Sequence, residues 1–129
     1  MKTPKISVSW GELFDKMTIL EIKLENLKSK SSLKNVKKEH NQLRTIFDQS
    51  FLNNTNADRL IKELRLINQS LWKIEDKVRD KERIKTFDDD FIELARSVYL
   101  TNDERSRIKN KINYVFGSEL VEEKSYTNY

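Results

Sequence analysis

Apolar residues recur every three or four positions along most of this chain, which is the period of an α-helix packed on one face. The clearest example spans Ser9 to about Lys28, where one broad face is apolar when successive residues are placed 100° apart. That face contains Trp10, Leu13, Phe14, Met17, Leu20, Leu24 and Leu27. Ile19 and Ile22 lie on the opposite side. We therefore expect this helix either to be central in the structure or to use its second face for a dimer contact.

Helix-start and helix-end signals divide the rest of the chain. Three pairs have the spacing of a capping box, in which a hydroxyl residue precedes an acidic residue by three positions. They are Ser9 with Glu12, Thr55 with Asp58 and Thr101 with Glu104. Gly117 is placed to end the last helix, because glycine readily adopts the left-handed conformation that follows many helices. The predicted helices cover about 9–28, 33–51, 57–85, 87–99 and 101–116, between an extended arm at 1–8 and a C-terminal tail at 118–129.

The third predicted helix carries a heptad seam, with apolar residues at alternating steps of four and three. The first predicted helix has an apolar line of the same spacing, which favours antiparallel packing of these two helices. The seam is Leu60, Leu64, Ile67, Leu71, Ile74 and Val78, and the matching line is Leu13, Met17, Leu20, Leu24 and Leu27. The pattern predicts an all-α fold: a single domain over residues 1–129, with about five helices around a long antiparallel core of coiled-coil type.

Composition supports this fold class. Only two glycines and one proline occur among 129 residues, and none lies between residues 12 and 116. Folds rich in strands need turn residues about every 8–12 positions, so most of them are excluded. Hydrophobic and charged residues each make up 36% of the chain, and the regular spacing of the hydrophobic ones argues against disorder.

The composition also narrows the chemistry. The absence of cysteine excludes disulfides and thiolate metal sites, and the single histidine, His40, leaves too few ligands for a typical zinc site. The N-terminal segment lacks the apolar run of a signal peptide, and no stretch approaches the ~18 apolar residues of a membrane span. No phosphate-binding glycine loop or nucleophile motif is present. We expect a cytoplasmic protein without a membrane span.

Glu21 is the most informative polar residue of the first predicted helix, because it lies within the apolar arc between Phe14 and Met17. A buried carboxylate must form an ion pair, accept hydrogen bonds or take up a proton. Glu21 is therefore part of a ligand site, or one half of a structural ion pair with an arginine of another helix, or on a face less buried than the helical wheel implies.

A second group of polar residues lies where the fourth and fifth predicted helices meet. Arginines on both sides of a helix start can hold an anion such as a phosphate or a carboxylate. The alternative is a capped helix junction stabilised by local hydrogen bonds, with Arg96 or Arg105 as the partner of Glu21. The group contains Arg96, Tyr99, Thr101, Asn102, Asp103 and Arg105, and it continues to Lys109 and Asn113.

Carboxylates at helical spacing allow a different interpretation, because successive turns can present oxygen donors to one divalent cation. Under this alternative, Glu12, Asp15, Glu21 and Glu25 would bind Mg²⁺ or Mn²⁺, and the protein would be an all-α enzyme acting on a nucleotide or phosphorylated substrate. Such spacings also arise by chance in a chain with 21 acidic residues. The main interpretation therefore includes no cofactor.

Residues 23–44 carry a net charge of +5, compared with +4 for the whole chain. This stretch could attract nucleic acid or an anionic membrane surface. It lacks interleaved aromatic residues for base stacking, and the chain has no recognised nucleic-acid-binding motif. A solvated helix face is the simpler interpretation, and a nucleic-acid-associated protein is the third functional hypothesis.

Two parts of the chain carry a family resemblance. Residues 9–27 contain Gly11, Glu12, Asp15, Lys16, Thr18, Glu21 and Lys23, and residues 87–126 contain Tyr99, Asn102, Asp103, Arg105 and the run Glu123-Lys124-Ser125-Tyr126. With these residues the whole chain resembles a family of small bacterial and phage proteins of unknown function. The resemblance implies a helical fold and no particular activity.

The resemblance coincides with the two polar groups, which suggests that the first helix faces the junction of the fourth and fifth. Glu21 would then meet Arg96 or Arg105, and Lys124 and Tyr126 would close over the pocket. The candidate ligand-binding residues are Glu21, Arg96, Tyr99, Asn102, Asp103, Arg105 and Lys124. The first functional hypothesis is a non-enzymatic binding or assembly module with a polar pocket for a small anionic ligand. The two apolar faces of the first helix make a homodimer or a protein partner plausible.

Overall fold

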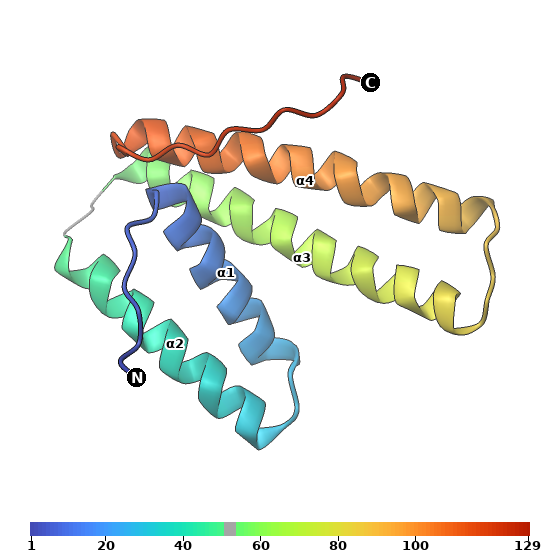
Figure 1. Ribbon diagram of the computed structural model, residues 1–129, viewed down its shortest axis with the longest axis horizontal. Helices are drawn as coiled ribbons and strands as arrows, with labels where there is room; N and C mark the ends of the chain where they lie inside the picture. The colour runs from blue at the N-terminus through green and yellow to red at the C-terminus, as the bar shows by residue number, and fades with distance from the viewer. Residues whose placement is uncertain (51–53) are drawn as a thin grey trace.

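The computed structural model describes residues 1–50 and 54–129, and over these residues the chain is all-helical, as predicted. The described residues form four helices, one fewer than the sequence pattern indicates (Figure 1). They are α1 (Trp10–Asn26), α2 (Lys30–Gln49), α3 (Thr55–Arg83) and α4 (Asp89–Val115). None of these four helices is long and apolar enough to cross a membrane.

The helix count differs because α4 continues through the predicted junction at Thr101 and Glu104. The prediction of a separate fifth helix was therefore wrong. No glycine or proline interrupts this stretch. Extending an existing helix by one turn is much easier than starting a new helix, because nucleation is the unfavourable step. The whole helix begins at Asp89, and Asp88 is its N-cap, whose carboxylate accepts a hydrogen bond from the backbone N–H of Phe91 at 3.0 Å.

The other helix ends follow local capping chemistry. Ser9 caps α1 as predicted, and its hydroxyl accepts a hydrogen bond from the N–H of Glu12 at 3.1 Å. Gly117 ends α4 as predicted, with a φ of 61°. The cap of α3 is Asn54 instead of Thr55, because the Asn54 side chain accepts hydrogen bonds from two backbone N–H groups.

The remaining predicted bounds shift slightly. The first helix ends at Asn26, two residues before the predicted end. The second begins at Lys30, capped by Ser29, instead of near Leu33. Its predicted end at residue 51 lies outside the described residues.

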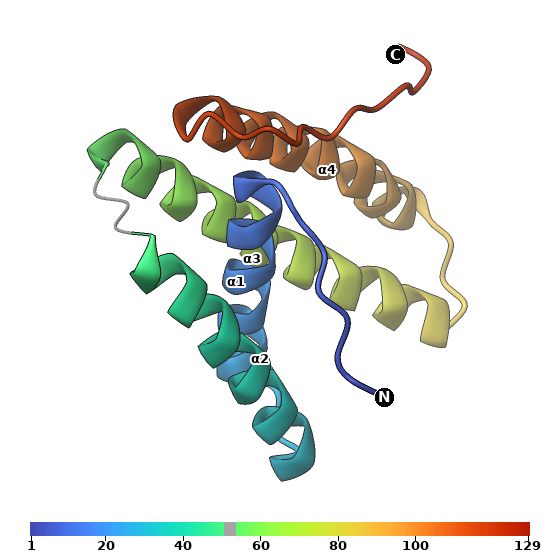
Figure 2. The same ribbon diagram turned by 60° about the vertical axis from the view of Figure 1, so that its left-hand side comes forward.

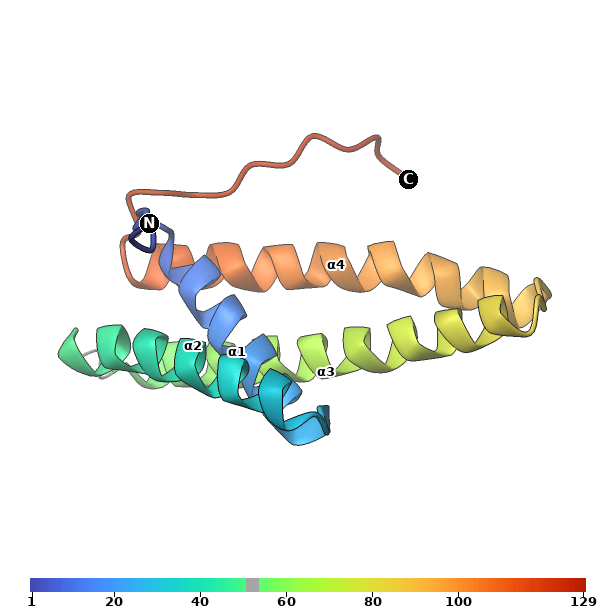
Figure 3. The same cartoon turned by 60° about the horizontal axis from the view of Figure 1, so that its bottom comes forward.

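Helix α1 is the central element, because it contacts each of the other three helices. Helices α3 and α4 lie side by side and run in opposite directions, and α1 crosses them at an angle (Figures 1 and 3). Among the described helices, α2 contacts only α1 and lies at the outside of the structure (Figure 2). Helix α3 has its most extensive contact with α4, whereas the heptad spacing predicts α1 as its main partner. Leu60 and Leu64 of the seam nevertheless belong to the core cluster that includes residues of α1.

The apolar core lies where α1 crosses the α3–α4 pair. Its buried members are Leu13, Phe14, Met17, Leu60, Leu64, Ile108 and Ile112. Aromatic rings close one end of this core: Phe14 and Phe116 stack with centroids 5.6 Å apart, and Phe47 of α2 meets Phe14 edge-on at 5.5 Å. The core therefore holds the start of α1 against the end of α4.

A glycine makes this contact close. A Cβ atom added to Gly11 would lie 2.5 Å from the carbonyl oxygen of Lys109 and 2.9 Å from Oδ1 of Asn113. The N–H of Gly11 donates a hydrogen bond to that same Asn113 oxygen at 2.6 Å. The backbones of α1 and α4 therefore touch directly, which brings the first turns of α1 onto residues 105–113.

We expect Gly11→Ala to destabilise the protein by about 1–3 kcal/mol, because the methyl group would press on the backbone of α4. The loss should appear although alanine is the better helix former by about 1 kcal/mol. Urea denaturation followed by circular dichroism measures the effect. Ser70→Ala at an exposed position of α3 is the control and should leave the midpoint unchanged. A Gly11→Ala protein as stable as wild type would contradict the close approach.

Candidate functional site

Asp15 of α1 carries the most deeply buried carboxylate, with only 1% of the residue exposed. Arg105 of α4 binds it with two donors: Nε donates to Oδ1 at 2.9 Å, and Nη2 donates to Oδ2. Asn68 of α3 donates to Oδ1 of Asp15 at 3.0 Å and to the hydroxyl of Thr18 at 3.0 Å. One carboxylate thus joins three helices, and its charge is both paired and hydrogen-bonded, as burial requires.

The ion pair also orients Arg105. Hydrogen bonding to Asp15 raises the pKa of the guanidinium above its ordinary value, outweighing the opposing effect of burial. The remaining terminal nitrogen, Nη1, donates to the side-chain oxygen of Asn102 at 3.3 Å. Arg105 is therefore held on two sides, by α1 and by its own helix.

Lys109 lies one turn after Arg105, and its side chain is buried. Its Nζ donates to Oε2 of Glu12 at 2.8 Å and to Oε2 of Glu122 at 3.0 Å, and lies 3.9 Å from Oδ2 of Asp15. Burial lowers the pKa of Lys109, but the hydrogen bonds to Glu12 and Glu122 outweigh it and the pKa is raised overall. The ammonium group is therefore charged at neutral pH.

A small cavity of about 260 Å³ lies over these two cations, and we call it the Arg105 pocket. It is formed by α1, α4 and the C-terminal tail. All of its lining residues are polar or charged: Glu12, Asn102, Arg105, Ser106, Lys109, Glu122 and Lys124.

The C-terminal tail returns along the outside of α4 (Figures 1 and 3). At its start the Ser118 hydroxyl accepts a hydrogen bond from the N–H of Trp10 at 3.3 Å. At its end the Tyr129 hydroxyl donates to Asp103, and the Tyr129 ring lies 5.5 Å from that of Tyr99. Hydrogen bonds and this ring contact connect the tail to the helices.

The Arg105 pocket brings together three of the predicted ligand residues: Asn102, Arg105 and Lys124. Tyr99 and Asp103 lie nearby on α4, in contact with the end of the tail. Arg96 is elsewhere: its exposed side chain pairs with Glu93 of the same helix at 2.9 Å. Tyr126, which we expected to close over the pocket, is 74% exposed and does not line it.

The prediction that Glu21 pairs with Arg96 or Arg105 was wrong. Its carboxylate is bound by Arg65 of α3 and lies 3.4 Å from Nε2 of His40 of α2, not near Arg96 or Arg105. The side chain is 30% exposed, because it lies at the edge of the apolar arc between α2 and α3. The same arginine also binds Glu25. Glu21 therefore forms the structural ion pair that was the alternative interpretation.

Sequence reasoning placed Lys109 in the second polar group but not among the candidate ligand-binding residues. It missed Ser106 and Glu122, which also line the pocket, and it did not single out Asp15 as the buried carboxylate. A signal for Asp15 exists, because Gly11, Asp15, Thr18 and Ile22 share one face of α1 at steps of four, three and four, and all four are buried. Arg105 and Lys109 likewise share a face once α4 is read as continuous. The predicted break at Thr101 concealed that relation.

Residues 4–129 match a family of unknown function, DUF6165. The chain belongs to this family. The predicted resemblance to a family of unknown function is thereby confirmed, and it covers nearly the whole chain. No curated protein and no solved structure matches the chain. Membership of DUF6165 thus supplies no activity.

The four carboxylates of the metal interpretation fall into two separate pairs in this DUF6165 chain. Glu12 and Asp15 face the cations of α4, whereas Glu21 and Glu25 both bind Arg65. Within residues 1–50 and 54–129, no group of three or more histidine, aspartate or glutamate side chains is placed to hold a metal ion.

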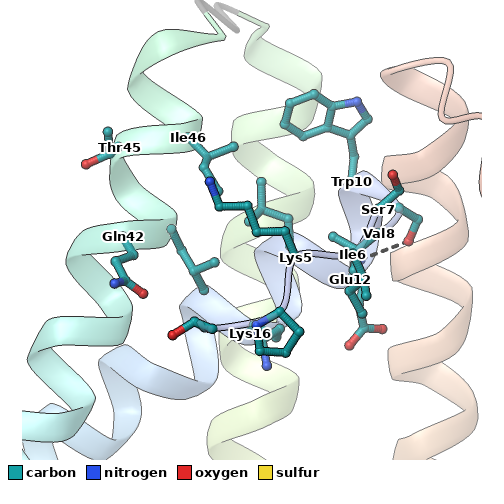
Figure 4. A pocket seen from close by; sticks show the side chains of 15 residues that line it. Lys5, Ile6, Ser7, Val8, Trp10, Glu12, Lys16, Gln42, Thr45 and Ile46 are labelled. Carbon is teal, nitrogen blue, oxygen red and sulfur yellow. Dashed lines mark hydrogen bonds between the residues drawn. The ribbon is translucent and has the colours of Figure 1, made fainter. Parts of the chain in front are cut away.

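A larger cavity, about 1160 Å³, lies between the N-terminal arm and the α1–α2 pair (Figure 4). Apolar side chains such as Ile6, Val8 and Ile46 line it, together with Lys5 and Lys16. Every residue from 1 to 8 is exposed, so one wall of this cavity has few contacts that would hold it in place. The Arg105 pocket, in contrast, is lined entirely by polar side chains, several of which are held by ion pairs and hydrogen bonds.

The basic stretch 23–44 lies at the end of α1 and on α2 (Figure 1), and none of its residues lines the Arg105 pocket. Most of its lysines are exposed, including Lys34, Lys37 and Lys38. Arg44 pairs with Asp48 one turn further along the helix. The stretch has the character of a solvated helix face.

We expect Asp15→Asn to destabilise the protein by about 3–5 kcal/mol, because it leaves Arg105 and Lys109 beside a group that no longer carries the neutralising charge. The matched control is Glu25→Gln on the same helix, whose exposed pair with Arg65 should contribute less than about 1 kcal/mol. Urea denaturation of both variants measures the difference. Equal losses would show that Asp15 has no special role.

We expect acid to loosen the tail. The hydrogen bond from Lys109 lowers the pKa of the Glu122 carboxyl below its ordinary value of 4.5. Burial raises this pKa, but by less. A lowered folded-state pKa contributes stability above the unfolded value, and this stability is lost as pH falls through the folded value. NMR signals of residues 119–129 should therefore change below pH 4.5 in wild type, and this step should be absent in Glu122→Gln. An identical titration in both proteins would contradict this assignment.

Proposed function

We propose that this protein is a non-enzymatic binding module that holds a small anionic ligand in the Arg105 pocket. The observation that carries the proposal is the convergence of three cations on one small polar cavity. Arg105 and Lys109 come from α4, and Lys124 comes from the tail. Asn102 and Ser106 add neutral hydrogen-bonding groups to the same lining.

The position of Arg105 supports anion binding. Its contacts with Asp15 and Asn102 fix the guanidinium before a ligand arrives, so less side-chain entropy is lost on binding. A guanidinium carries five N–H donors. Asp15 and Asn102 use three of them, so two N–H groups of Arg105 remain for an anion. The pocket therefore has a preorganised donor at its base and a more exposed cation, Lys124, at its edge.

The protonation states favour binding over catalysis. Effective general acids and bases have a pKa near the working pH. Here the pKa of Lys109 is raised and that of Glu122 is lowered, so both stay charged near neutrality. Neither group is suited to exchange protons with a substrate at that pH.

The size of the cavity supports a small ligand. Pockets for drug-sized molecules typically measure about 300–1,000 Å³, whereas the Arg105 pocket measures about 260 Å³. Every lining residue is polar, so an apolar ligand body would gain little from burial there. The ligand is therefore expected to be compact and polar, bound chiefly through its anionic group.

A thermal-shift and calorimetric screen tests the proposal. The probes are simple carboxylates, inorganic phosphate, nucleotides, and Mg²⁺ or Mn²⁺ with and without nucleotide. We expect at least one simple anion to bind without metal, and a ligand at 100 times its Kd stabilises a protein by about 2.7 kcal/mol. A response only to a metal together with a nucleotide would support the enzyme hypothesis instead.

Lys124→Gln locates the binding site, because this exposed side chain can be changed without disturbing the core. Removing one charge-assisted contact at an exposed position should weaken anion binding about three- to tenfold. Lys111→Gln is the matched control, since Lys111 is also an exposed lysine but does not line the pocket. Equal weakening in both variants would indicate a general charge effect and contradict the assigned site.

A further inference from the structure

We propose that the Glu122 carboxylate occupies the anion position of the Arg105 pocket, and that the ligand is a single carboxylate group that displaces it. This inference rests on the proposed function and adds the ligand's chemical class and the role of the tail. The C-terminal tail would then act as a built-in competitor for the pocket.

The position of Glu122 is that of a bound carboxylate. Its Oε2 accepts a hydrogen bond from Nζ of Lys109 at 3.0 Å, and its Oε1 lies 3.5 Å from Nζ of Lys124. The group thus bridges two of the three cations that would recognise an anionic ligand. A free carboxylate with the same two oxygens could make the same two contacts.

Charge at the pocket supports displacement over simple addition. Three cations and three carboxylates lie together there: Arg105, Lys109 and Lys124 with Glu12, Asp15 and Glu122. With Glu122 in place the group is neutral, so an added anion would meet no excess positive charge. With Glu122 removed the group has one excess positive charge, which matches one carboxylate. A dianion such as phosphate would exceed it.

Glu122 is the one of these three carboxylates that does not lie on a helix. Glu12 and Asp15 belong to α1, and Asp15 is held by two other helices. Glu122 lies on a tail without regular secondary structure, in which Val121 and Glu123 on either side are exposed. Segments with few buried apolar contacts open at low free-energy cost. Figure 3 shows this tail following the outer side of α4.

Acetate and inorganic phosphate at constant ionic strength are the probes that test the inference. Binding is measured by calorimetry, and the mobility of residues 119–129 is measured by ¹⁵N relaxation. In wild type we expect acetate to bind more tightly than phosphate and to increase the mobility of the tail. Unchanged tail mobility at saturating acetate would overturn the displacement, and tighter binding of phosphate would overturn the ligand class.

Glu122→Gln and its matched control Glu123→Gln give the sharper comparison, because each removes one negative charge from neighbouring positions. Glu123 forms no ion pair within the described residues. We expect Glu122→Gln to bind acetate about three- to tenfold more tightly than wild type and to have a mobile tail without ligand, since a partly exposed ion pair competes only modestly. Glu123→Gln should resemble wild type in both measurements.

The outcomes separate this inference from the proposed function. If wild type binds acetate but Glu122→Gln binds it equally or more weakly, the competitor role is overturned and the proposed function stands. If both variants gain affinity equally, net charge explains the effect and the role of Glu122 is overturned. If neither wild type nor Glu122→Gln binds any anion, the proposed function and this inference both fail.

Discussion

The rest of the structure depends on one ion pair at the crossing of three helices. Asp15 of α1 is fully surrounded by protein, yet Arg105 and Asn68 satisfy its oxygens from α4 and α3. A buried ion pair is weak evidence for stability, because desolvation offsets much of the attraction. Its stronger effect here is geometric, since any other register of α1 on α4 would leave Asp15 without its partners. Gly11 reinforces that constraint by allowing the two backbones to touch.

The same constraint explains why a polar cavity forms at this position. Once the first turns of α1 lie on residues 105–113, Glu12 and Asp15 must neutralise Arg105 and Lys109. The cations are then rigid and lie close to the surface, which is the arrangement that anion recognition requires. The tail completes the lining from outside with Glu122 and Lys124. One group of charges thus has both a structural role and the proposed binding role. Its buried members hold its more exposed members in place.

The success and failure of sequence reasoning follow from the range of each interaction. Ser9, Asp88 and Gly117 act on backbone groups within a few residues, so local patterns identify such helix ends. The false break at Thr101 shows the limit, because a capping-box pair also occurs inside an uninterrupted helix. Asn102 and Arg105 were nevertheless named as candidates, since several donors cluster there in sequence. Glu122 was missed and Lys109 was named only as a continuation of that cluster, because both gain significance from groups 13 to 97 residues away in the chain.

The sequence by itself determined that this protein is helical, that α1 has two packed faces, and that polar groups on α1 and near residue 100 are exceptional. Hydrophobic periodicity carries that information, because the period belongs to each helix alone. Only the tertiary structure decided which charges meet. Glu21 and Asp15 lie less than two turns apart on one helix, yet one faces Arg65 and the other Arg105. Helix crossing angles and the close contact at Gly11 select these partners, and neither can be read from a single helix.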